Sequence, residues 1–288
     1  MKLTKTISGA ARSALQWRLM LIWLACTLLP TLIVAMPVWS TLSATLDHSV
    51  HAPALAQELD LAALFDIFNA FRLNAVALQS TAVAAVVLTL LLSPFLSGVI
   101  VTAARHDGPA PFKLLFAGGM AEYPRMFRML LWAIVPLGVA AAVGGQVADM
   151  AGEHAAQAIT YGDARPWLLA STVLTAALLL FANATLDAGR ATLAIDRRRT
   201  SAVKGWWRGL LLLRRRPGAM LGIYLALTLA GVLLAALLGL GRINIPRVGL
   251  PGFLAALLIT QLIALIVGWM RTARLFALVS LAGIVHKG

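Results

Sequence analysis

The chain has 288 residues, of which 60% are hydrophobic and only 12% are charged, with a mean hydropathy of +0.87. Soluble globular domains average about 45–50% apolar and about 25% charged residues, so this composition excludes an ordinary soluble protein. The 24 Lys and Arg residues exceed the 11 Asp and Glu residues, which gives a net charge of +13. Apolar runs separate these charges, whereas nucleic-acid binding needs one basic face, so we expect no nucleic-acid partner.

Six apolar runs are long enough to cross a bilayer as helices, which takes about 20 residues for a hydrocarbon core of about 30 Å. The runs lack the alternating pattern of a membrane β-barrel, and helices satisfy their own backbone groups in lipid. The sequence therefore predicts an all-α polytopic membrane helix bundle, a single integral membrane domain over residues 1–288. The expected spans are 19–39, 74–103, 129–147, 167–186, 220–240 and 253–270.

Lys and Arg residues gather in alternate segments between these spans. The N-terminal segment, 105–128, 190–216 and 271–287 together hold 20 basic residues, and this side of the protein has 4 acidic residues when Asp187, at the end of the fourth span, is counted with it, which gives +16. The remaining segments hold 4 basic and 7 acidic residues, which gives −3. Because cytoplasmic loops carry the excess of Lys and Arg, this pattern predicts a multi-pass protein of the bacterial inner membrane with both termini in the cytoplasm.

A basic, semi-amphipathic stretch precedes each pair of spans, at 3–17, 112–128 and 200–216. This pattern predicts three helical hairpins, each introduced by an amphipathic helix in the cytoplasmic interface. Three parallel repeats would be related by an axis along the membrane normal. Six consecutive spans form three hairpins even without an internal repeat, so the presence of a true repeat stays open.

The connector 190–216 holds nine of the basic residues, and its apolar side chains at 203, 206, 207, 210 and 211 fall largely on one helical face. This pattern is typical of a basic amphipathic helix in the membrane interface. Anionic lipid attracts such segments by about 1 kcal/mol per basic residue. We therefore predict contact with anionic headgroups, or with a partner protein. The candidate residues are Arg197, Arg198, Arg199, Lys204, Trp206, Trp207, Arg208, Arg214, Arg215 and Arg216.

Part of this connector resembles a known membrane domain. The resemblance lies in Lys204, Trp206-Trp207, Gly209, Leu210–Leu213 and Arg216-Pro217, within the stretch Ala194–Gly218. It is similar to the connector in the multi-helix membrane domain attached to some bacterial glycerophosphodiester phosphodiesterases, and in related stand-alone inner-membrane proteins. The resemblance implies a multi-helix membrane fold. It implies no phosphodiesterase activity, because the chain contains no phosphodiesterase barrel.

Polar side chains lie near the cytoplasmic end of the fourth span. Asp187 and Arg190 are three residues apart, so they share a helical face and can pair, and Asn183 lies one turn earlier. Intramembrane ionisable groups are candidate functional sites, but Asp187 is expected at the interface, where a charge costs little. We therefore favour a structural pair over a transport site. Arg271, after the sixth span, is a candidate partner for Asp187, although we favour an interfacial tail over residues 275–285.

The sequence contains no motif of the common hydrolases, nucleotide-binding proteins or metalloproteases, so we expect neither catalysis nor a cofactor. His48 and His51 have ligand-type chemistry, but a solvated loop is favoured over a metal site. The function that we predict is that of a non-enzymatic integral membrane protein, which acts through lipid contact or as accessory to a membrane complex. A membrane-protein partner or a second copy of the chain stays open. The alternative is a small-solute transporter with Asn183, Asp187 and Arg271 lining its path.

Overall fold

The computed structural model describes residues 3–47, 61–106, 108–158, 160–196, 198, 200–245 and 249–287. Over these residues the chain is helical and contains no strand, which confirms the all-α class. The helices, in chain order, are α1 (Leu3–Ser13), α2 (Trp17–Leu46), α4 (Leu61–Leu73), α5 (Ala75–Arg105), α6 (Phe112–Ala156), α7 (Tyr161–Ile195), α8 (Ala202–Arg215), α9 (Pro217–Ile243) and α10 (Leu250–Lys287).

Six of the described helices are long and apolar enough to cross a membrane: α2, α5, α6, α7, α9 and α10. Their most apolar windows have mean hydropathies between 1.8 and 2.4. Each of the six helices coincides with one of the predicted spans, and the span predicted to begin at residue 74 begins at Ala75 in α5. Large apolar side chains are exposed along them, such as Val139, Leu237 and Leu258 at 61–64%. Such a surface needs lipid rather than water, so the chain is a polytopic, multi-pass membrane protein.

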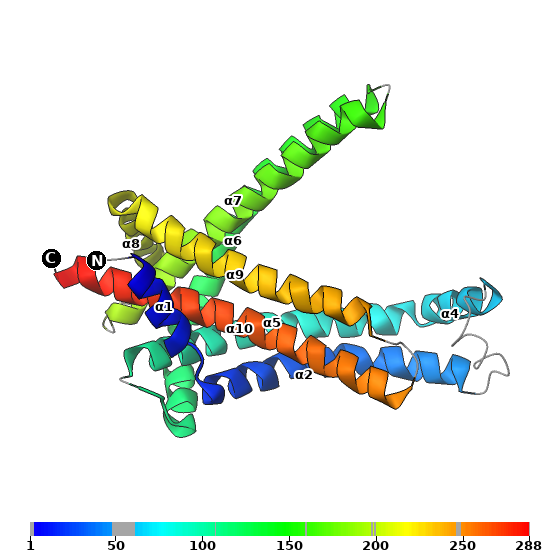
Figure 1. Ribbon diagram of the computed structural model, residues 1–288, viewed down its shortest axis with the longest axis horizontal. Helices are drawn as coiled ribbons and strands as arrows, with labels where there is room; N and C mark the ends of the chain where they lie inside the picture. The colour runs from blue at the N-terminus through cyan, green and yellow to red at the C-terminus, as the bar shows by residue number, and fades with distance from the viewer. Residues whose placement is uncertain are drawn as a thin grey trace.

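The helices α2, α5, α9 and α10 lie side by side, whereas the outer part of the α6–α7 hairpin diverges from them (Figure 1). Both termini, α1 and α8 lie at one end of this bundle, and α4 lies at the other end. We call the first of these the basic end, because the Lys- and Arg-rich segments 105–128, 190–216 and 271–287 lie there. The two termini thus share one side of the protein, as the sequence predicts.

The buried core lies at the basic end. The largest fully buried side chains come from the first turns of α2 and α9, the early part of α6, and the last turns of α5, α7 and α10. They include Leu19, Val99, Leu115, Met126, Met129, Leu186, Leu193, Met220, Ile223, Tyr224, Leu227 and Leu278. Towards the opposite end the spans keep fewer buried side chains, so the basic end holds the bundle together.

Two expected interfacial segments belong to longer helices. The stretch 112–128 is not a separate helix, because it forms the start of the 45-residue α6. The apolar residues 275–285 are not an interfacial tail, because they continue α10, and Leu275, Leu278 and Leu281 are buried in the core. α10 packs there against α7 and α1. Hydropathy alone predicts lipid contact for such residues, but neighbouring helices cover them instead.

The connector helix α8 packs closely against α7 through small residues. Its buried side consists of Ala202, Gly205, Gly209 and Leu212. A Cβ atom on Gly209 would lie 2.8 Å from the carbonyl carbon of Ala188 in α7, so the two backbones nearly touch. Only glycine permits this approach, and close packing through small residues is a common means of joining membrane helices.

We expect Gly209→Ala to destabilise the protein by about 1–3 kcal/mol, because backbone atoms of α7 cannot move aside as a flexible side chain could. Gly218→Ala is the matched control, since a Cβ atom there meets nothing within 4 Å. The thermal unfolding midpoint of each variant in detergent checks this. Equal midpoints for the two variants would contradict the close contact.

Candidate functional site

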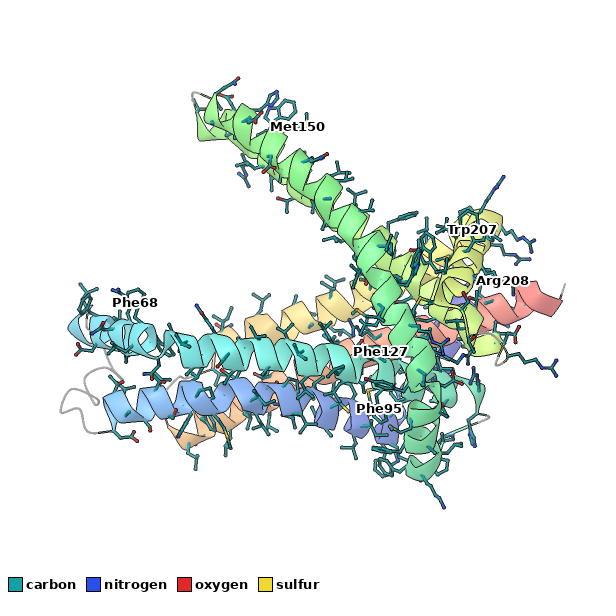
Figure 2. The ribbon with its side chains drawn as sticks, turned by 180° about the vertical axis from the view of Figure 1, so that it is seen from behind. Phe68, Phe95, Phe127, Met150, Trp207 and Arg208 are labelled. Atoms are coloured by element: carbon teal, nitrogen blue, oxygen red, sulfur yellow. The ribbon has the colours of Figure 1, made fainter. Side chains whose placement is uncertain are left out.

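Helix α8 presents two rows of side chains on its exposed side. Val203, Trp207 and Leu211 are spaced four residues apart and are 47%, 58% and 38% exposed. Lys204 and Arg208 form a second row beside them, and both are exposed. Trp207 and Arg208 can be located on α8 in Figure 2. We call these five residues the outer face of α8. An apolar row beside a basic row is the arrangement of a helix that lies in a membrane interface.

The sequence-predicted contact residues divide between this face and the protein interior. Lys204, Trp207, Arg208, Arg214, Arg215 and Arg216 are exposed, and so is Arg198. Trp206 instead points into the protein: its Nε1 donates to Thr185 Oγ1 (3.0 Å), and its ring lies edge-on to Trp132. Arg197 and Arg199 lie outside the described residues. The structure therefore assigns Trp206 to helix packing and leaves Trp207 as the exposed aromatic residue.

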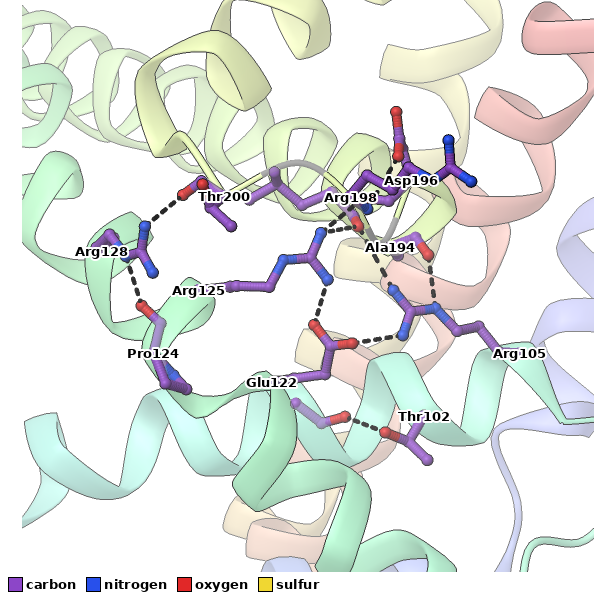
Figure 3. Close-up of polar contacts among 12 residues, drawn as sticks. Thr102, Arg105, Glu122, Pro124, Arg125, Arg128, Ala194, Asp196, Arg198 and Thr200 are labelled. Carbon is purple, nitrogen blue, oxygen red and sulfur yellow. Dashed lines mark hydrogen bonds and ion pairs between the residues drawn. The ribbon is translucent and has the colours of Figure 1, made fainter.

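The C-terminal end of α7 lies among arginines from α5 and α6 (Figure 3). Arg105 Nε donates to the carbonyl of Ala194 (2.6 Å), and Arg125 Nη2 donates to the carbonyls of Leu193 and Asp196 (both 2.7 Å). The last carbonyls of a helix have no partners within the helix and carry a partial negative charge. The two guanidinium groups therefore satisfy groups that would otherwise be unpaired inside the protein.

Glu122 joins the two arginines. Its Oε1 lies 2.6 Å from Arg105 Nη1 and its Oε2 lies 2.5 Å from Arg125 Nη1. Glu122 and Arg125 are only 6% and 7% exposed. A buried carboxylate is tolerated when it is paired and hydrogen-bonded, and here both of its oxygens are engaged. We call Arg105, Glu122 and Arg125 the α7 clamp.

The α7 clamp was not predicted from the sequence. From the sequence, Glu122 and Arg125 contribute only to the distribution of charge, although their spacing of three residues permits an ion pair on one helix. The available signal was Glu122 itself, a lone acidic residue on the helical stretch 112–128, which is otherwise basic. Arg105 and the carbonyls of α7 lie too far away in the sequence for any local pattern to connect them.

The predicted pair near the end of α7 is present. Arg190 Nη1 lies 2.6 Å from Asp187 Oδ1. The second arginine near this carboxylate is Arg274, whose Nη2 lies 3.8 Å from Asp187 Oδ2. Arg271 is exposed, and its guanidinium lies 5.8 Å from the centre of the Trp23 ring. Asn183 donates to the Leu179 carbonyl of its own helix.

Arg274 connects α10 to α9 as well as to α7. It is 7% exposed, its Nη1 donates to Thr228 Oγ1 (3.2 Å), and its guanidinium lies 4.6 Å from the centre of the Tyr224 ring. A guanidinium over an aromatic ring is a favourable cation–π contact. The polar groups around Asp187 thus bind one another across three helices, as expected of a structural lock.

Nothing in the described part of the chain points to a metal site, since no three His, Cys, Asp or Glu side chains come together there. His48 and His51, which the sequence analysis weighed as ligands, lie outside the described residues. The charged side chains that α1 and α8 expose at the basic end are lysines and arginines. These side chains recognise anions and interfaces rather than cations.

We expect Glu122→Gln to lower the stability of the protein by about 3–5 kcal/mol, because it leaves two guanidinium groups without a counter-charge in a buried place. Glu153→Gln is the matched control, since Glu153 is exposed near the far end of the same helix. The difference between the thermal unfolding midpoints of the two variants in detergent measures this effect. A midpoint for Glu122→Gln equal to that of the control would show that the α7 clamp does not stabilise the fold.

The choice of Arg274 over Arg271 as the partner of Asp187 is tested by double-mutant cycles. Asp187→Asn combined with Arg274→Met should give a coupling energy of about 0.5–3 kcal/mol, as expected for groups in one network. Asp187→Asn combined with Arg271→Met should give a smaller value. The measurement is the free energy of unfolding in mixed micelles. A larger coupling with Arg271 would reverse the assignment.

Comparison of the chain with protein-family models, with curated proteins and with solved structures gave no match. The resemblance of residues 194–218 to a phosphodiesterase-associated membrane domain therefore stays a prediction from the sequence.

Proposed function

We propose that the protein is a non-enzymatic integral membrane protein that contacts anionic lipid headgroups through the basic end. The observation that supports this best is the outer face of α8, where an exposed apolar row lies beside an exposed basic row. The protein could also act as an accessory to a membrane complex in this way. The outer face of α8 would recruit acidic lipid and hold the protein at a defined depth in the bilayer.

The composition of the outer face of α8 supports an interfacial position. Trp207 prefers the lipid–water boundary, where its ring is covered and its N–H group is hydrated. Val203 and Leu211, on the same row, would be covered by the upper part of the acyl chains. Lys204 and Arg208 would then meet the phosphates, each with an attraction of about 1 kcal/mol.

The distribution of charge supports the orientation. Twenty of the 24 Lys and Arg residues belong to the segments of the basic end, which the positive-inside rule places in the cytoplasm. We therefore propose that the basic end faces the cytoplasm and that the membrane is a bacterial inner membrane. The cytoplasmic leaflet carries the anionic lipids that this end would meet.

A solute pathway at Asp187 gains no support from the contacts of this residue. Both of its carboxylate oxygens face arginines, and Arg274 also binds Thr228 and Tyr224. A group that is occupied in this way holds helices together. The lipid-contact role is accordingly the function that the geometry supports best.

A fluorescent probe on α8 tests this proposal in the full-length chain. Cys26, the single cysteine, is replaced by Ser, and Trp207→Cys carries an environment-sensitive dye. In vesicles we expect blue-shifted emission, with a larger shift when phosphatidylglycerol replaces half of the phosphatidylcholine. The additional changes Lys204→Ala and Arg208→Ala should remove this dependence on anionic lipid, because they delete the basic row.

The matched control removes two charges at the opposite end of the protein, with Arg72→Ala and Arg165→Ala, both exposed in the structure. It should leave the lipid dependence of the emission unchanged. Emission typical of water in both kinds of vesicle would show that the outer face of α8 does not contact lipid. Equal emission in neutral and anionic vesicles would show that the basic row does not select acidic headgroups.

A further inference from the structure

The basic end contains a second feature with the chemistry of lipid recognition, separate from α8. A groove of about 1270 Å³ lies between α1, the segment that follows α5, and the last part of α10. The residues that line it come from 5–18, from 103–109 and from 276–280. It brings together parts of the chain that are more than 250 residues apart in the sequence.

The groove is positively charged. Lys5, Arg12, Arg18 and His106 line it, and none of its described lining residues is acidic. Among the described residues, none of these four forms an ion pair, unlike the arginines of the α7 clamp. Asp107, which follows His106 in the sequence, lies outside the described residues. Three basic side chains, Lys5, Arg12 and Arg18, that converge on one groove without an acidic partner among the described residues favour an anionic ligand.

The other part of the groove is apolar. Leu15 and Trp17 line it and are 66% and 60% exposed, and Phe276 and Val279 line it from α10. Trp17 is the first residue of α2, the first helix long enough to cross a membrane, and tryptophan prefers the lipid–water boundary at the end of such a helix. The groove therefore combines a cationic part at headgroup level with apolar side chains beside the bilayer. A soluble anion would use only the cationic part, whereas a phospholipid uses both.

The side chain of Gln16 indicates that a ligand of the groove also donates a hydrogen bond. Its Nε2 donates to the Ser13 carbonyl (3.2 Å), which fixes the orientation of the amide. Its Oε1 is buried and accepts no hydrogen bond from the described residues. An unpaired buried acceptor is costly, so a hydrogen-bond donor is expected there. Gln16 is half-buried and lines the groove, so a rotation of its side chain would bring Oε1 to a donor on a ligand there.

We propose that this groove binds one anionic phospholipid whose headgroup carries a hydroxyl group, as phosphatidylglycerol does. The phosphate meets Lys5, Arg12 and Arg18, and the headgroup hydroxyl donates to Gln16 Oε1. The upper acyl chains lie on Leu15 and Trp17. Basic pockets between membrane helices on the cytoplasmic side are typical sites for anionic headgroups. The proposal rests on the membrane-facing position of the basic end given under Proposed function, but it does not depend on α8.

Native mass spectrometry of the full-length chain in detergent tests this site. We expect one phosphatidylglycerol to remain bound under conditions that remove phosphatidylcholine. Lys5→Ala with Arg12→Ala should weaken its binding by about fivefold for each charge removed. Both side chains are exposed, so the fold should persist, and the thermal midpoint checks this. If the double variant is unstable, Arg12→Gln alone should still weaken binding by about fivefold.

The variant Gln16→Leu distinguishes recognition of the headgroup hydroxyl from recognition of the phosphate. It should weaken the binding of phosphatidylglycerol by about fivefold, as for one lost hydrogen bond, and leave phosphatidic acid, which lacks the headgroup hydroxyls, unchanged. The matched control Arg72→Ala with Arg165→Ala removes the same number of charges from exposed positions outside the basic end and should retain the bound lipid. A loss of bound lipid in Lys204→Ala with Arg208→Ala, but not in Lys5→Ala with Arg12→Ala, would place the lipid on α8 and overturn the groove site.

Two further outcomes would overturn the proposal. Equal retention of phosphatidylglycerol and phosphatidylcholine would show that the groove does not select anionic lipid. Glycerol 1-phosphate that competes with phosphatidylglycerol at equal concentration would show that the ligand is a soluble phosphate compound. If the dye on α8 reports water but phosphatidylglycerol is still retained, the proposed function of α8 is contradicted and the groove site stands. If the dye reports the interface but no phosphatidylglycerol is retained, the groove site fails and the proposed function stands.

Discussion

The contact between the α7 clamp and the C-terminal carbonyls of α7 determines where the other elements of the basic end lie. Arg105 comes from the end of α5 and Arg125 from α6, and both donate to the last turn of α7. α8 follows directly and packs against α7 through Gly209, whose backbone lies against Ala188 and Gly189. The position of α8, and hence of its outer face, therefore follows from how the end of α7 is held.

The basic residues of the chain have two different roles at this end. Some are buried or half-buried with an acidic partner: Arg105 and Arg125 with Glu122, and Arg190 and Arg274 with Asp187. Each of these carboxylates lies between two guanidinium groups, which offsets part of the cost of burying the charges. The remaining basic side chains, on α1 and along α8, are exposed. The large positive charge thus divides into a part that holds helices together and a part that is free to meet anions.

The fold was largely predictable because lipid selects for long apolar runs, which any window of the sequence reveals. The boundaries were less so, because hydropathy does not distinguish burial in lipid from burial in protein. Leu278 in α10 is an example: it belongs to an apolar run that the sequence predicts to be an interfacial tail, yet it is fully buried, in a helix that packs against α1 and α7. The stretch 112–128 likewise reads as a separate amphipathic segment, although it continues into α6.

The candidate site was predictable only where its members are close in the sequence. Asp187 and Arg190 share one turn of a helix, so spacing alone pairs them. Arg271 and Arg274 are also three residues apart, and only the packed structure shows that Arg274, which also contacts Tyr224 and Thr228 on α9, is the one near Asp187. Such a choice depends on the rotation of one helix against another, which packing determines and local spacing does not.

Helices α1 and α8 show how one sequence pattern can serve two kinds of surface. Both are short, basic and amphipathic, and both lie at the basic end. α1 buries Ala10 in the protein core, as does Ala14 directly after the helix, and the basic side chains of α1 border a groove. α8 buries small residues against α7, so its larger apolar side chains, Val203 and Trp207, remain uncovered. Because small residues bring α8 close to α7, Val203 and Trp207 are left uncovered by the protein, and for this reason we propose that the bilayer interface covers them.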